Sequence, residues 1–166
     1  MLRKIEDFQK AWQYEAESTE KVLRQLTDAS LSQPVAAGGR TLGGLAWHLV
    51  QTLGEMPAKV GLVVDAPKWD APMPATAAEI ADSFAMSARS LSDAVGEDWT
   101  DETLLQTGEM YGEVWPRGLT LFYVITHQAH HRGQMTVLMR QAGLAVPGVY
   151  GPAREEWEAM GVPAMP

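Results

Sequence analysis

The sequence predicts an all-α fold, a four-helix bundle with one long crossover connection. Three observations lead to this prediction. Apolar residues recur at three- and four-residue steps, the spacing of an amphipathic helix, in four long segments of the chain. Glycines and prolines separate these segments. The chain has 166 residues, 46% of them hydrophobic, which suffices to bury one core, so we expect residues 1–166 to form a single helical domain.

The first two predicted helices cover residues 5–26 and a stretch that begins at Thr41. The polar, proline-containing sequence "TDASLSQPVAAGGR" ends the first of them. Thr41 is a suitable N-cap for the second, because its side chain can accept a hydrogen bond from the first helical turn. Pro57 lacks an N–H group and is therefore expected to kink or shorten this helix.

The third predicted helix begins at Thr76, where Glu79 three residues later completes a capping box, and is expected to end near Gly96. The fourth covers residues 119–141, and Gly143 caps it. Apolar residues occupy most of the circumference of this fourth helix. This pattern predicts burial on more than one side, either at the centre of the bundle or against another subunit.

The connections between these helices are long. "DAPKWDAPMPAT", before the third helix, is a proline-rich linker. Residues 101–118 have no helical period and are expected to form a short hairpin or an irregular loop, and we expect the long crossover to follow the third helix. The tail is rich in glycine and proline, with a short helical piece near residues 154–160.

Composition excludes several classes of function. The chain has no cysteine, so disulfides, a thiolate nucleophile and a zinc–sulfur site are excluded. Its net charge of −8 argues against nucleic acid as a partner. No apolar run reaches the length of about 18 residues that a membrane span needs. The first residues, "MLRKIEDFQKAWQYEAE", lack the apolar core of a signal peptide, so a cytoplasmic protein is expected.

Three of the four histidines lie within "ITHQAHHRGQM". His127 and His131 are four residues apart, about 40° around a helix, and can direct their ring nitrogens at one point. His130 lies on another side and is interpreted as a neighbour or supporting group. His48, at the edge of the apolar stripe of the second helix, is the remaining candidate for a third ligand. A single histidine on a helix is more often structural, but the pair together with His48 favours a metal site with an open coordination position.

Three motifs resemble the DinB-like superfamily, which includes YfiT-type metal-dependent hydrolases: "LAWHLVQTLGEM", "HQAHHRGQMTVLMRQAGL" and "VPGVYGPAREEWEAMG". The most specific of them contains H-x-x-x-H-R-G-Q, which runs from His127 to Gln134. The resemblance covers essentially the whole chain. It implies an up-down-down-up four-helix bundle, a homodimer, and a divalent metal, zinc or nickel, held by His48, His127 and His131.

The resemblance and the ligand set together predict a metal-dependent hydrolase that activates water and acts on a small molecule. One alternative is a transferase that uses a low-molecular-weight thiol such as bacillithiol or mycothiol on the same metal. A second is a non-catalytic, stress-associated metal-binding protein. Glu55, Tyr123 and Gln134 are candidate pocket or supporting residues by their spacing from the histidines. Arg132 points away from His127 and is expected in an ion pair or an inter-subunit contact.

Overall fold

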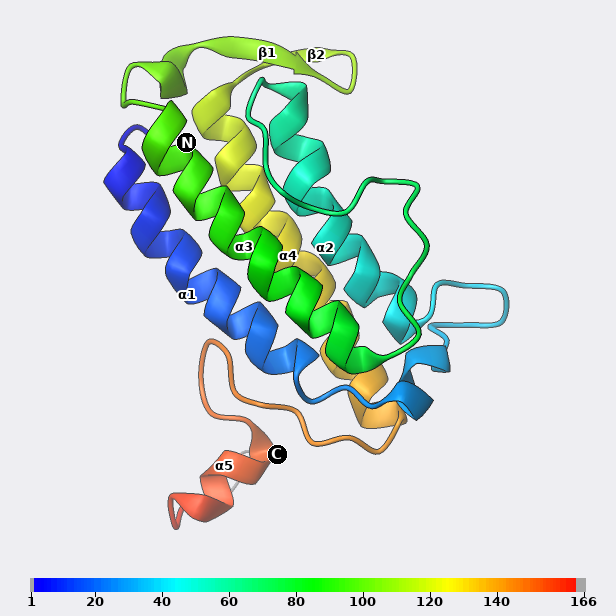
Figure 1. Ribbon diagram of the computed structural model, residues 1–166. Coiled ribbons are helices and arrows are strands. Elements are labelled where there is room, and N and C mark those ends of the chain that lie inside the picture. Colours follow the sequence, from blue (N-terminus) through cyan, green and yellow to red (C-terminus); the bar gives the residue numbers. More distant parts are fainter. Residues whose placement is uncertain (1, 164–166) are drawn as a thin grey trace.

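A computed structural model describes residues 2–163 and confirms the predicted helical fold (Figure 1). Four long helices make up the bundle: α1 (Ile5–Leu23), α2 (Leu42–Lys59), α3 (Ala77–Asp98) and α4 (Arg117–Gln141). Shorter elements lie in the connections and the tail: η1 (Asp28–Ser32), η2 (Thr103–Leu105), β1 (Thr107–Met110), β2 (Glu113–Pro116) and α5 (Arg154–Ala159).

The order of the helices around the bundle explains its connections. Both α1 and α2 pack against α3 and α4. Figure 1 shows that α2 and α3 run in one direction, whereas α1 and α4 run in the other. Because α2 and α3 are parallel neighbours, residues 60–76 must run the length of the bundle to join them. The prediction that the crossover follows the third helix is therefore wrong, since it follows the second.

Residues 99–116, after α3, stay at one end of the bundle because α3 ends where α4 begins. They contain a small antiparallel hairpin in which β1 pairs with β2. Its turn is formed by Tyr111 and Gly112, both with positive φ (53° and 87°), the combination that two-residue hairpin turns require. Of the two predicted forms of this segment, the hairpin is the one observed.

Several helix ends differ from the periodicity-based predictions. Helix α1 ends at Leu23 rather than at residue 26, because a separate 3-10 turn, capped by Thr27, follows it. Pro57 does not shorten α2, which continues to Lys59, since the proline lies in the last turn and costs only one backbone bond there. Helix α3 passes through Gly96, where a side chain would collide with the amide of Gln9.

The core lies between the four helices and contains large side chains such as Phe8, Trp12, Phe84 and Leu49. The indole N–H of Trp12 on α1 donates to a backbone oxygen of α3, 2.9 Å away, and so ties these helices together. Helix α4 buries one broad face in the bundle but exposes apolar side chains on the other. Within residues 2–163, no helix is long and apolar enough to span a membrane.

Candidate metal centre

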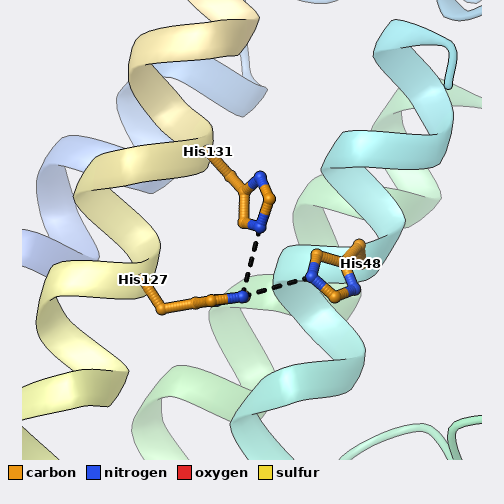
Figure 2. A group of neighbouring side chains, drawn as sticks. All are labelled: His48, His127 and His131. Carbon is orange, nitrogen blue, oxygen red and sulfur yellow. Dashed lines mark hydrogen bonds between the residues drawn. The ribbon is translucent and has the colours of Figure 1, made fainter. Parts of the chain in front are cut away.

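Three histidines meet where α2 packs against α4 (Figure 2). Helix α2 carries His48 near its middle, and α4 carries His127 and His131 one turn apart. The Nε2 atom of His127 is 3.2 Å from Nε2 of His48 and 3.1 Å from Nε2 of His131. Within residues 2–163, no other His, Cys, Asp or Glu side chain joins a group of this kind.

The ring nitrogens fit a divalent cation better than they fit one another. A neutral imidazole nitrogen offers either one proton or one lone pair, so Nε2 of His127 can serve only one of its two neighbours fully. Bonds of about 2.0–2.1 Å from a metal to histidine nitrogens place neighbouring nitrogens about 2.9 Å apart in an octahedral site and about 3.3 Å apart in a tetrahedral one. The two observed separations fall between these values. These two pairs of nitrogens are therefore spaced as ligands of one metal ion would be, and the possible ligand atoms of all three histidines lie within 4.8 Å of one another.

Gln134 fixes the orientation of one ring. Its side-chain oxygen lies 2.7 Å from Nδ1 of His131, so it accepts the proton on that nitrogen. The lone pair of Nε2 then points at the other histidines, as a metal ligand requires. The amide nitrogen of Gln134 is 3.3 Å from Nε2 of His130, which places His130 beside the group but outside it. By contrast, Nδ1 of His127 is buried and has no hydrogen-bond partner in the described chain.

The surroundings keep all three rings neutral. Burial, followed by the nearby histidines and Arg40, lowers the pKa of His48 to about 3. Burial and positive neighbours likewise lower the pKa of His127 to about 4. The pKa of His131 is also lowered, mainly by burial, although its bond to Gln134 opposes the shift. At neutral pH the nitrogen lone pairs are therefore available to a cation.

Two cavities open on this group from opposite sides. The first, of about 650 Å³, is called the Arg40 cavity and is lined by His48, His131, Arg40, Gln134, Val137 and others. The second, of about 460 Å³, is called the aromatic cavity and is lined by His48, His127, Glu55, Trp69, Tyr111, Trp115, Tyr123 and others. Because His48 lines both cavities, a ligand in either one would reach the histidines.

Comparison with known proteins places the chain in a family. The family model described as "DinB family" matches residues 1–164. The chain belongs to the DinB family. It is 45% identical over 164 residues to Uncharacterized protein YrdA of Bacillus subtilis (strain 168), a match that covers 99% of this chain and 98% of that protein. It also resembles the crystal structure of a DinB-like protein from Bacillus cereus ATCC 10987, with a TM-score of 0.87 and 45% identity over 90% of this chain and 100% of that one.

In this DinB-family chain the three supporting residues predicted from spacing take different places. Gln134 contacts His131 directly and lines the Arg40 cavity. Tyr123 lines the aromatic cavity, where its ring packs against Trp115 with centroids 4.6 Å apart. Glu55 lines the same cavity. It accepts a hydrogen bond of 2.6 Å from the Tyr111 hydroxyl and pairs with a lysine one turn on, so it is not part of the histidine group.

Sequence reasoning missed three residues near the histidines. Trp69 lies in the crossover and meets His48 edge-on, with ring centroids 5.5 Å apart. Tyr111 reaches the aromatic cavity from the hairpin turn. Arg40 lies in the loop before α2, which begins at Leu42, and lines the Arg40 cavity. No helical spacing relates these three residues to the histidines, because all three lie in connections.

Proposed function

We propose that this chain is a divalent-metal-dependent enzyme that acts on a small molecule, with zinc or nickel held by His48, His127 and His131, and that its reaction is hydrolysis. The observation that carries the proposal is the convergence of three neutral ring nitrogens at a point open to two cavities. A structural metal site is usually closed by a fourth protein ligand. Among the described residues no fourth side chain joins the histidine group, and Glu55, which lies on the same helix as His48, bonds to Tyr111 instead.

The ligand set suits the activation of an anionic nucleophile. An ion held by three neutral histidines keeps its full positive charge and would supply Lewis-acid chemistry, including a lowered pKa of water, at neutral pH. Gln134 holds the Nδ1 proton of His131 and so orients that ring. Tyr111 stays protonated, because burial and its bond to Glu55 raise the pKa of its hydroxyl. It therefore remains neutral and donates its hydrogen bond to Glu55 at the edge of the aromatic cavity.

A second candidate is transfer of a low-molecular-weight thiol to an electrophile. The presence of two cavities on one histidine group favours it, because a two-substrate reaction needs two binding spaces that share one reacting centre. Hydrolysis needs only one substrate-binding cavity, because its second reactant is water. Both candidates use the same three ligands, so experiments must separate them.

Metal binding is tested first. Purified protein is stripped with EDTA and titrated with Zn²⁺ and Ni²⁺ by calorimetry, with elemental analysis of the protein as isolated. We expect one equivalent to bind, and each of His48→Ala, His127→Ala and His131→Ala to remove it. His130→Ala is the matched control, because His130 is adjacent but outside the group, and it should bind metal as before. Wild-type protein without stoichiometric metal, or full binding by His48→Ala, would contradict the proposal.

The reaction is then tested on the metal-loaded protein. One assay follows cleavage of p-nitrophenyl acetate, and another follows conjugation of chlorodinitrobenzene with bacillithiol, mycothiol or glutathione. Metal-dependent ester cleavage without thiol selects the hydrolase. Activity that needs both the metal and one thiol selects the transferase. Stoichiometric metal without either activity favours the non-catalytic binding protein.

We also propose a homodimer formed through the outer face of α4. Phe122 is a large apolar side chain that is 40% exposed on this helix, whose other face is buried in the bundle. Such side chains are commonly covered by a second subunit when they share one surface. Light scattering after gel filtration should give twice the mass of the chain, 18.2 kDa. A Phe122→Glu variant that still elutes as a dimer would exclude this interface.

A further inference from the structure

Arg40 is held at the entrance to α2 by backbone hydrogen bonds. The N–H of Val35 donates to the backbone oxygen of Arg40 over 2.9 Å, and the N–H of Leu42 donates to that of Gln33 over 2.8 Å. Between them, Pro34 and Thr41 form an isolated antiparallel bridge. The backbone of this loop is therefore fixed at the mouth of the Arg40 cavity, and the side chain of Arg40 extends along its lining.

In the described part of the chain, the guanidinium of Arg40 has no partner of its own. Within residues 2–163, the one hydrogen bond that Arg40 makes uses its backbone oxygen, and no carboxylate pairs with it. Three other arginines, Arg24, Arg132 and Arg140, each pair with a glutamate or an aspartate. Among the residues that line the Arg40 cavity there is no acidic side chain, although the protein has a net charge of −8. The cavity is thus a positively charged space in an acidic protein.

The other residues that line the Arg40 cavity indicate what kind of molecule this charge would attract. Leu45, Val137 and Leu138 form apolar walls, and Gln134 and Gln141 add neutral amides. A guanidinium binds a carboxylate through two parallel hydrogen bonds. One arginine with two neutral amides matches a singly charged carboxylate better than a doubly charged phosphate. The volume of about 650 Å³ is that of a small-molecule site.

We propose that Arg40 selects substrates that carry a carboxylate on an apolar body, and that it anchors the carboxylate in the Arg40 cavity while the rest of the molecule reaches the histidines. The position of the reacting group rests on the proposed metal site. Binding of the carboxylate does not, because Arg40 and the cavity walls belong to the protein alone. The two ideas can therefore fail separately.

The test uses sodium hexanoate as the probe, with hexanamide as its neutral analogue and hexyl phosphate as the competing anion. Each probe is titrated by NMR into full-length protein, both metal-free in EDTA and loaded with Zn²⁺. The variants are Arg40→Gln and Arg40→Lys. Arg89→Gln is the matched control, because Arg89 is an exposed arginine on α3 outside this cavity and its loss changes the net charge equally. Thermal melting checks that each variant is folded.

We expect Arg40→Gln to raise the Kd of hexanoate by about tenfold in both metal states, as for loss of a charge-assisted pair at a partly exposed site. The Kd of hexanoate for Arg40→Lys should lie between those of wild type and Arg40→Gln, because lysine keeps the charge but not the planar guanidinium. Arg89→Gln should bind hexanoate with the Kd of the wild type, and the Kd of hexanamide should be the same for wild type and Arg40→Gln. The proposal would be overturned if wild type and Arg40→Gln bound hexanoate with the same Kd, or if hexanoate did not bind saturably. It would also be overturned if Arg40→Gln raised the Kd of hexyl phosphate more than that of hexanoate. Loss of metal binding alone would overturn only the proposed function.

Discussion

The buried ion pair between Arg132 and Glu15 offers a quantitative test of what stabilises the bundle. The side chains are 2% and 9% exposed, and the guanidinium nitrogen Nη2 lies 2.7 Å from a carboxylate oxygen of Glu15. Arg132 also donates to the hydroxyl of Thr19 over 3.0 Å and to that of Tyr150 over 2.7 Å. Tyr150 in turn donates to Glu15 over 2.7 Å. The network joins α1, α4 and the C-terminal tail.

Substitution Arg132→Met keeps an apolar stem but leaves the carboxylate of Glu15 buried with a single hydroxyl partner. Breaking a buried pair in this way costs about 3–5 kcal/mol of the free energy of unfolding, because one charge stays uncompensated. For a chain of this length, about 2–4 °C of melting temperature corresponds to 1 kcal/mol. We therefore expect Tm to fall by about 6–20 °C.

The measurement is thermal and urea unfolding of metal-free protein by circular dichroism. Arg24→Met is the control, because Arg24 pairs with acidic residues at the surface with 42% of its side chain exposed, and such pairs contribute about 1 kcal/mol or less. The double variant Arg132→Met with Glu15→Met should recover stability relative to Arg132→Met, since no buried charge remains. A loss below about 1 kcal/mol for Arg132→Met would refute this account of the network.

Three further outcomes are expected. Gln134→Leu should weaken Zn²⁺ binding by about tenfold or more in calorimetry, because the ligand ring loses the partner that orients it, whereas His130→Ala should not. The pKa of His48 in the folded state is lowered to about 3, so between about pH 3 and pH 6.5 the unfolded chain binds a proton that the folded chain does not. Urea unfolding of metal-free protein should therefore show that the free energy of unfolding is highest above pH ~6.5 and declines below it. His48→Gln should reduce that decline. Gly118→Ala should cost about 1–3 kcal/mol in the same assay, because the added methyl group would collide with the backbone oxygen of Leu2.

The existence of the four helices could be predicted from periodicity, but their arrangement could not; the up-down-down-up order observed was implied by the family resemblance alone. Periodicity identifies the face that each helix buries, and the capping box of Thr76 and Glu79 marks the start of α3 correctly. Periodicity does not say which neighbours share a face. Residues 60–76 and 99–116 are both long connections without helical pattern, and only the parallel packing of α2 and α3 decides which one runs the length of the bundle.

The candidate site could likewise be predicted only in part from the sequence. The spacing of His127 and His131 on one helix predicts that their rings meet, and the structure brings His48 to them from α2. Glu55 has the right spacing from His48 to share its face, and it does line the aromatic cavity. Its bond to Tyr111 was not predictable, because a hairpin turn carries that tyrosine across from another part of the chain. Spacing within one helix therefore predicts which of its side chains meet, but not which residues from other parts of the chain surround them.

The crossover, residues 60–76, was predicted to follow the third helix instead of the second, and it also forms one wall of the site. The side-chain amide of Gln51 on α2 donates to the backbone oxygens of Lys68 and Trp69, at 3.1 and 2.7 Å. The indole of Trp47 donates to the backbone oxygen of Ala71, 3.0 Å away. These bonds hold the crossover against α2, so that Trp69 lies beside His48 and in the lining of the aromatic cavity. Because parallel α2 and α3 require a lengthwise connection, the topology itself supplies an aromatic wall that four antiparallel helices with short loops would lack.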